Sequence, residues 1–245
     1  MIEICDITKS FGSKVVLRSI SMTVQEGETM VVLGRSGCGK SVILKHLIGL
    51  LKPDSGEVLV DDEPITGLPE RKLTEVRRKV GMLFQSAALF DSMSVEENLA
   101  FPLREQKIRD EAEIARRIEE ALEMVDLPGE QKKMPSELSG GMRKRVGLAR
   151  TIIGRPRCVL YDEPTTGLDP ITTDSINHLI RRLQKRLGVT SIVVTHDMKT
   201  AFHCADRVAF LHEGRVHFLG TIEELKASKD PVVCDFIDGR SGDTD

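Results

Sequence analysis

The chain has 245 residues, of which 40% are hydrophobic and 30% are charged, and its formal net charge at neutral pH is −3. This composition is that of a folded protein with one domain or two small ones, and it excludes a largely disordered chain. The slight acidic excess argues against a nucleic-acid-binding protein, because such proteins usually carry a basic excess that neutralises phosphates.

The five cysteines are scattered and form no CxxC pair, so we predict neither a disulfide framework nor a zinc site and expect a reducing cytosol. No apolar run approaches the roughly 20 residues that a membrane-spanning helix requires. The first residues do not resemble a signal peptide. We therefore expect the chain to reach a membrane only through partner subunits.

Taken in chain order, the first elements alternate apolar and polar residues over 2–24 around a turn at 11–14, which predicts short antiparallel strands. Continuous apolar runs follow and predict strands buried on both faces of a mostly parallel sheet. These runs are residues 29–33, 80–84, 158–161, 191–195 and 208–211. Helical patterns separate them, which predicts an α/β fold with a phosphate-loop core.

Helical signals dominate between residues 90 and 138, where Ser94 and Glu97 have the spacing of a capping box. Further on, apolar residues repeat with helical spacing at Ala115, Ile118, Leu122 and Val125. We predict a single domain over residues 1–245, with a helical subdomain at 90–156 inserted between core and β-subdomain segments at 1–89 and 157–238. The small, acidic end at 239–245 is predicted to be flexible.

A phosphate-binding motif follows the first buried strand. Its residues fit G-x-x-x-x-G-K-[ST] and are Gly34, Arg35, Ser36, Gly37, Cys38, Gly39, Lys40 and Ser41. The glycines let main-chain N–H groups face an anion, and the helix that follows directs its positive end at it. Lys40 is expected to reach the β- and γ-phosphates, and Ser41 to ligate Mg²⁺. The alternative is a glycine-rich turn that only joins strand to helix, and the flanking strand and helix disfavour it.

Two adjacent carboxylates, Asp162 and Glu163, follow the strand at 158–161. They are expected at the carboxyl edge of the sheet, where α/β proteins bind ligands. Asp162 suits an Mg²⁺ ligand through water, whereas Glu163 suits the group that polarises the water attacking the γ-phosphate. Acidic pairs after strands also cap helices, so this pair alone does not decide between the two roles.

The segment Leu138-Ser139-Gly140-Gly141-Met142 precedes a helical run at 143–153. Together with the phosphate loop, the acidic pair, Gly167-Leu168-Asp169 and His196, in this order and over nearly the whole chain, it resembles the ABC ATPases. The resemblance implies an enzyme that hydrolyses ATP with Mg²⁺ and works as a homodimer with membrane permease subunits. No nucleic-acid partner is expected, because of the acidic excess noted above.

The resemblance also assigns roles at the nucleotide. Ser139, Gly140 and Gly141 would contact the γ-phosphate of ATP held by the opposite subunit, although Ser139 read alone is simply a helix N-cap. The residues implied in hydrolysis are Glu163, His196, Gln85 and Lys40, and the implied Mg²⁺ ligands are Ser41, Gln85 and Asp162.

Two further positions carry an implied role and an alternative. Phe11 would stack on adenine, with core or turn packing as the alternative. Asp169 would cross the dimer interface, and Asp169-Pro170 is also a good helix start.

Four longer segments, at 39–42, 82–93, 135–150 and 161–170, resemble more narrowly the Mla/Mce-type lipid-transport ATPases. This resemblance implies phospholipid transport between the membranes of a double envelope, with an Mce-type lipid-binding protein and a peripheral position on the cytoplasmic side of the inner membrane. An amino-acid or ion importer is the runner-up, and a non-transport ABC ATPase comes after it.

The basic residues at 143–145 and the apolar pair at 89–90 each allow two interpretations. Arg143, Lys144 and Arg145 are expected to form a solvated basic helix face rather than a lipid headgroup site. Leu89 and Phe90 either line a groove for the permease or belong to the chain's own core. The five histidines other than His196 are expected to be surface or packing residues.

Overall fold

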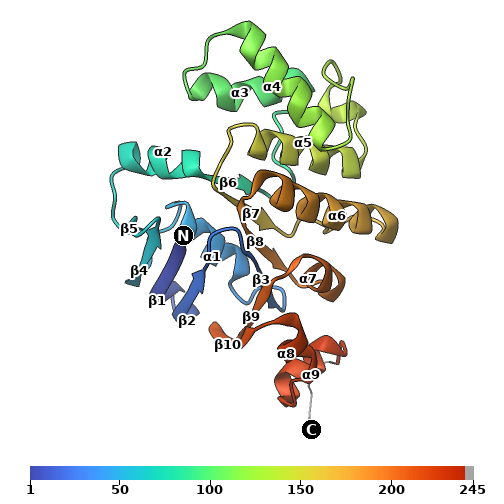
Figure 1. The fold of residues 1–245 in the computed structure, drawn as a ribbon. Helices are drawn as coiled ribbons and strands as arrows, with labels where there is room; N and C mark the ends of the chain where they lie inside the picture. Colours follow the sequence, from blue (N-terminus) through green and yellow to red (C-terminus); the bar gives the residue numbers. More distant parts are fainter. Residues whose placement is uncertain (241–245) are drawn as a thin grey trace. The chain divides into compact units, whose positions relative to one another are not determined.

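A computed structural model of the chain describes residues 1–240. Its internal contacts divide the chain into two compact units. Figure 1 labels the helices and strands. Within the described residues the first unit comprises residues 1–76 and 190–240, and the second comprises Arg77–Val189. Helix α2 (Glu70–Lys79) contains the first of the two boundaries.

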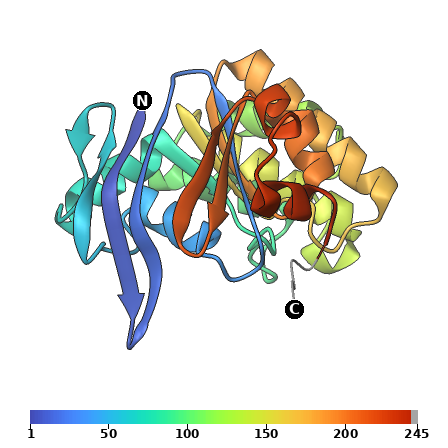
Figure 2. The same ribbon diagram turned by 90° about the horizontal axis from the view of Figure 1, so that it is seen from below.

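The first unit begins with an antiparallel sheet in the order β2-β1-β4-β5. Its strands are β1 (Ile2–Phe11), β2 (Lys14–Val24), β4 (Ser55–Val60) and β5 (Glu63–Pro64). Phe11 pairs with Lys14 across the turn, so the predicted antiparallel strands are confirmed. Figure 2 shows β1 and β2 as two long arrows running side by side.

The same unit contains strands in the order β10-β9-β3-β8, and β3 is parallel to both of its neighbours. The bounds are β3 (Thr29–Gly34), β8 (Thr190–Thr195), β9 (Arg207–His212) and β10 (Arg215–Gly220). Every residue of β3 and β8 is buried, as the apolar runs predict. The helices of this unit are α1 (Lys40–Leu47), α7 (Met198–Cys204), α8 (Ile222–Lys226) and α9 (Pro231–Ile237).

The second unit contains the parallel pair β6 (Val80–Leu83) and β7 (Cys158–Asp162). Its helices are α3 (Val95–Glu105), α4 (Glu111–Met124), α5 (Gly140–Ile152) and α6 (Pro170–Leu187), with a short 3₁₀ turn at Pro135–Glu137. The capping box predicted at Ser94 is confirmed, because the Ser94 hydroxyl accepts the Glu97 N–H and the Glu97 carboxylate accepts the Ser94 N–H.

The apolar stripe of α4 differs by one residue from the predicted one. Ile114, Ile118 and Leu122 are buried, whereas Ala115 is exposed. The stripe therefore begins with the larger aliphatic side chain, because burying isoleucine removes more apolar surface from water than burying alanine.

The architecture is α/β, with parallel strands, a separate antiparallel sheet near the N-terminus and a helical segment, as predicted. The limits drawn for the single domain and its helical subdomain stay predictions. At the C-terminal end the Arg240 N–H donates to the Asp235 carbonyl at 2.8 Å, and residues 241–245 of the predicted flexible end lie outside the described part of the chain. Among the helices at residues 1–240, none combines the length and apolarity needed to cross a bilayer.

Candidate functional site: a phosphate loop and a hydrolytic edge

The phosphate loop joins β3 to α1 in a conformation that depends on glycine. Gly37 and Gly39 have φ angles of 79° and 108°, a region that L side chains rarely adopt. A Cβ on Gly39 would also lie 2.7 Å from Leu17 Cδ2. The loop therefore needs glycine at Gly39 for both backbone freedom and space.

Lys40 begins α1 and is buried. Its ammonium group donates to the Gly34 carbonyl at 2.8 Å and to the Arg35 carbonyl at 3.2 Å. Arg35, Ser36 and Gly37 are exposed. The loop thus presents its outer residues to solvent while the lysine lies against its main chain, within reach of an anion bound there.

His196 leaves the same edge of the sheet as the phosphate loop. Leu33 of β3 pairs in parallel register with Thr195 of β8, and Gly34 and His196 follow these two residues. His196 is exposed. The first unit therefore brings together two of the predicted groups, the loop and the histidine, at one strand edge.

A cavity of ≈570 Å³ opens beside the phosphate loop. Its walls include Val15 and Val16 of β2, with Gly37 and Cys38 of the loop. Phe11 is not among the lining residues; its side chain is 48% exposed, with the Lys9 ammonium 5.8 Å from the ring centroid. The apolar wall beside the loop is thus formed by two valines that the sequence did not single out.

In the second unit Gln85 and the acidic pair also leave one strand edge. Leu83 of β6 pairs with Tyr161 of β7, and the two loops begin directly after these strands. Asp162 and Glu163 are buried, whereas Gln85 is exposed. This is the second group that the structure brings together, and we call it the hydrolytic edge after the role predicted for its residues, which are Gln85, Asp162 and Glu163.

The Glu163 backbone has φ of 48°, in the left-handed region. A non-glycine residue persists there only when its surroundings fix it. Thr166 supplies part of that support, because its N–H donates to the Glu163 carbonyl at 3.3 Å and its hydroxyl donates to Glu163 Oε2 at 3.2 Å. The carboxylate is therefore held in a defined position.

The predicted solvated basic face at Arg143, Lys144 and Arg145 is wrong for Lys144, which is 6% exposed. Its ammonium donates to the carbonyls of Gln85 and Glu163. Burial lowers the Lys144 pKa, and the Asp162 and Glu163 carboxylates act in the opposite direction. A lysine on the buried helix face, one turn from Gly147 and Leu148, was the sequence signal for this contact.

The two neighbours of Lys144 differ. Arg143 is exposed, as predicted. Arg145 is half-buried, and its guanidinium donates to Val125 O, Asp126 Oδ2 and Ser175 Oγ, each at 2.7 Å. It therefore links α5 to the end of α4 and to α6.

Ser139 and Asp169 are both helix N-caps. The Ser139 hydroxyl accepts the Met142 N–H at 3.3 Å at the start of α5, and Asp169 accepts the Ile171 and Thr172 N–H groups at 3.0 Å at the start of α6. Hydrogen bonds from Thr172 hold the Asp169 pKa below its ordinary value. Both side chains are exposed, so each helix start is open to solvent in the single chain. Their roles across a dimer stay predictions.

Gly141 lets the starts of these two helices approach closely, because a Cβ there would lie 2.6 Å from Thr172 Cγ2. The Leu168 side chain would lie 3.5 Å from a Cβ on Gly140. The Ser139-Gly140-Gly141 segment and the Asp169 turn are therefore neighbours within the second unit.

Phe90 is 41% exposed and Leu89 is half-buried, so Phe90 does not belong to the core of the chain. The Phe90 ring contacts that of Phe101, with centroids 5.1 Å apart, and the Arg150 guanidinium lies 5.7 Å from its centroid. The exposed ring is compatible with a permease contact, which stays a prediction.

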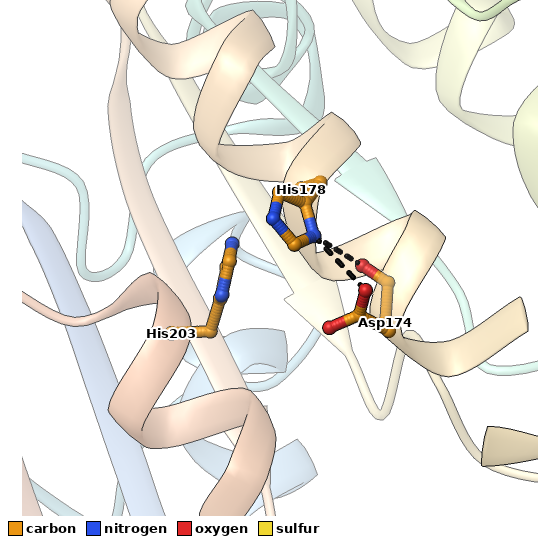
Figure 3. Close-up of side chains that lie close together, drawn as sticks. All are labelled: Asp174, His178 and His203. Carbon is orange, nitrogen blue, oxygen red and sulfur yellow. Dashed lines mark hydrogen bonds and ion pairs between the residues drawn. The ribbon is translucent and has the colours of Figure 1, made fainter. Parts of the chain in front are cut away.

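Two of the other histidines have local contacts within helices. His46 is buried and its Nδ1 lies 2.7 Å from the Val42 carbonyl, with burial as the main cause of its lowered pKa. On α6, His178 Nδ1 lies 3.0 Å from the Asp174 carbonyl and 3.3 Å from its carboxylate, one turn earlier (Figure 3). These contacts are those of packing and surface residues.

Known proteins that resemble this chain identify its family. The model of the family described as "ABC transporter" matches residues 17–166. The "Probable ribonucleotide transport ATP-binding protein mkl" of Mycobacterium tuberculosis is 43% identical, over 98% of this chain and 67% of its own length. The "Intermembrane phospholipid transport system ATP-binding protein MlaF" of Haemophilus influenzae is 42% identical, over 98% of this chain and 91% of its own length.

Among solved structures, that of the ATP-binding cassette MJ0796, a dimer in a post-hydrolysis state bound to ADP and phosphate, superposes with a TM-score of 0.83. It is 32% identical and covers 91% of this chain and 99% of its own. This chain belongs to the ABC transporter family. It is the ATP-binding, ATP-hydrolysing subunit of such a transporter.

Proposed function

We propose that two copies of this chain bind two ATP molecules, each between the phosphate loop of one protomer and the Ser139-Gly140-Gly141 helix start of its partner. The observation that carries this proposal is that both segments lie at helix starts and present exposed residues in the single chain, residues 35–37 in the loop and Ser139 and Gly140 at α5. Helix N-termini offer N–H groups and a positive dipole end to an anion. The dimeric cassette bound to ADP and phosphate, at 32% identity, supports a nucleotide-binding dimer.

The nucleotide's base and phosphates have separate candidate partners. Val15 and Val16 form an apolar wall in the cavity beside the loop, which suits a flat, largely apolar base, and Phe11 remains the candidate for ring stacking. Lys40 would exchange its contacts with the Gly34 and Arg35 carbonyls for contacts with the β- and γ-phosphates.

Oxygen donors suit Mg²⁺, and the candidates are the Ser41 hydroxyl, the Gln85 amide and the Asp162 carboxylate. All three are hard ligands with no competing thiolate among them, so the donor set fits this cation. When bound, Mg²⁺ would neutralise charge on the β- and γ-phosphate oxygens.

Hydrolysis would use Glu163 to hold and polarise the attacking water, with His196 contacting the γ-phosphate. The fixed backbone and carboxylate of Glu163 favour such a role, because a general base must be held in one position relative to the bond that changes. Loss of the γ-phosphate removes the anion that joins two protomers, so the dimer opens and the change is passed to the permease.

We infer that the transported substrate is a phospholipid or related lipid. The support is the 42% identity to an intermembrane phospholipid transport ATP-binding protein, over nearly all of both chains. The chain would lie on the cytoplasmic side of the inner membrane, bound to permease subunits, with an Mce-type lipid-binding protein completing the complex.

Purification of the intact complex from its native membrane, followed by mass spectrometry of bound small molecules, tests this inference. We expect co-purifying permease and Mce-type subunits and phospholipids enriched over the surrounding membrane. Lipids at membrane proportions, together with a retained non-lipid solute, would contradict it. A ribonucleotide is the specific alternative, because the mycobacterial relative at 43% identity is named a probable ribonucleotide transport protein. An amino-acid or ion importer stays the other alternative.

A further inference from the structure

Lys144 occupies an unusual place for a lysine. It lies on the buried face of α5 with only 6% of its surface exposed. Lysine is almost never this buried unless its ammonium group has partners. Two main-chain carbonyls meet this need, those of Gln85 and Glu163, the latter at 3.4 Å. One ammonium group therefore joins the loop after β6 to the loop after β7.

Both carbonyls belong to residues whose placement matters for hydrolysis. The two loops begin at the same strand edge, because Leu83 and Tyr161 are register partners. Glu163 has a left-handed backbone, and its carbonyl accepts from both Lys144 and the Thr166 N–H. A hydrogen bond from a charged donor is roughly twice as strong as one between neutral groups. Lys144 therefore adds a charged donor to the contacts that support this strained residue.

Electrostatics point the same way. The carboxylates of Asp162 and Glu163 favour the charged form of Lys144, against the larger effect of burial. A neutral side chain of similar shape would leave two carbonyls without this donor and would remove one positive charge from beside the two acids. The Lys144 ammonium nitrogen thus supplies both hydrogen bonds to the two carbonyls and a positive charge near the two carboxylates.

Other α5 residues contact β6 or the loop after it, through carbonyls other than that of Glu163. The Arg150 guanidinium donates to the Ala87 carbonyl at 3.0 Å, and the Thr151 hydroxyl donates to the Met82 carbonyl at 3.3 Å. Gly147 allows close approach, because a Cβ there would lie 2.9 Å from Ala87 Cβ. Lys144 is distinct among these α5 residues in bridging both loops of the hydrolytic edge.

We propose that Lys144 is a positioning residue for ATP hydrolysis, whose ammonium group fixes the main chains of Gln85 and Glu163 relative to each other. The proposal rests on the proposed roles of these two residues. It predicts that Lys144 affects the chemical step and leaves ATP binding to the phosphate loop unchanged.

The test compares Lys144→Met, which keeps the length of the side chain without a donor, with Lys144→Arg, which keeps a charged donor. For Lys144→Met we expect kcat to fall about 10- to 100-fold, the scale of a lost charged hydrogen bond, with KM for ATP within about twofold of wild type. Lys144→Arg should recover most of the loss. Unchanged kcat in Lys144→Met, or a KM increase that accounts for the whole loss, would overturn the proposal.

Three controls separate positioning from general destabilisation. Lys185→Gln removes an exposed lysine from α6 and should leave kcat and the melting temperature unchanged. If Lys144→Met does not fold, Lys144→Gln, which keeps one donor, replaces it with the same expected direction. Combined with Glu163→Gln, Lys144→Met should cost much less than it does alone, because a residue that acts through Glu163 has nothing left to position.

Equal losses in the two backgrounds would overturn the proposal. Wild-type protein that releases no phosphate would instead contradict the proposed function, and the inference with it.

Discussion

In the proposed site the phosphate loop and the hydrolytic edge would both hold groups still around a triphosphate, and the structure supports each of them by different means. The loop depends on its own backbone: Gly37 and Gly39 adopt positive φ angles, and Lys40 contacts carbonyls five and six residues away. The edge depends on a distant residue, because Lys144 bonds to carbonyls 59 and 19 residues away in sequence. Contacts within one loop leave a sequence motif, whereas contacts between distant residues leave only the helical spacing of one buried side chain.

The largest loss of ATP hydrolysis is expected from a substitution in the hydrolytic edge, at Glu163. Glu163→Gln keeps the shape of the side chain and removes its ability to act as a base, so phosphate release should fall by about 10²- to 10⁴-fold. ATP binding should persist, because Gly34, Lys40 and Ser41 belong to the other group. Phosphate release and equilibrium nucleotide binding are the measurements. Turnover near that of wild type would remove Glu163 from its proposed role.

The complementary change breaks the phosphate loop. Lys40→Ala removes the ammonium group expected at the β- and γ-phosphates, so both ATP affinity and hydrolysis should fall, affinity by about 10- to 100-fold for one charged contact. Titration calorimetry with ATP measures the affinity. If Lys40→Ala bound ATP as wild type does and lost only kcat, the assignment of ATP binding to the phosphate loop and of hydrolysis to the hydrolytic edge would be wrong.

Gly39→Ala sharpens the claim that the loop acts through its backbone. The new Cβ would meet Leu17 Cδ2 at 2.7 Å at a φ of 108°, so we expect a cost of about 1–3 kcal/mol in stability and a weaker ATP site. Denaturant unfolding measures the first and nucleotide titration the second. Gly188→Ala is the matched control, because Gly188 has φ of 63° but no atom within 4 Å of its Cβ position. Equal stability loss in the two variants would show that the crowding at Gly39 carries no weight.

The smallest effect on hydrolysis is expected at Phe90, outside both groups. Phe90→Ala should leave the basal ATPase rate within about twofold of wild type, as exposed positions usually do, yet reduce co-purification of the permease. Phe202→Ala on α7, where the ring is 38% exposed, is a control of similar exposure. Full assembly and coupled activity in Phe90→Ala would reject the docking role.

The features that the sequence predicted depend on local contacts, whereas those that it missed depend on contacts between distant residues. Continuous apolar runs predicted β3 and β8, because a strand buried on both faces has no polar positions to alternate. The capping box at Ser94 and the N-caps at Ser139 and Asp169 were also predictable, since a cap and its partners lie within three residues.

The buried Lys144 was missed because its partners come from other elements, and a basic trio on a helix is usually solvated. The same holds for the valine wall beside the loop, which depends on β2 and the β9–β10 turn contributing to one cavity. Ala115 shows the limit of periodicity, because Ala115 and Ile114 both fit a helical repeat and only packing decides which is buried.

Mixed dimers test the central claim of a shared nucleotide site most directly. All chains carry Glu163→Gln, and one also carries Lys40→Ala while the other also carries Ser139→Arg. If each site combines the loop of one protomer with the helix start of its partner, the mixed dimer keeps one intact site, formed by the loop of the Ser139→Arg chain and the Ser139 segment of the Lys40→Ala chain. We predict one ATP retained per mixed dimer after gel filtration and none in either dimer of identical chains. A mixture that retains no nucleotide, like the separate variants, would contradict the shared site.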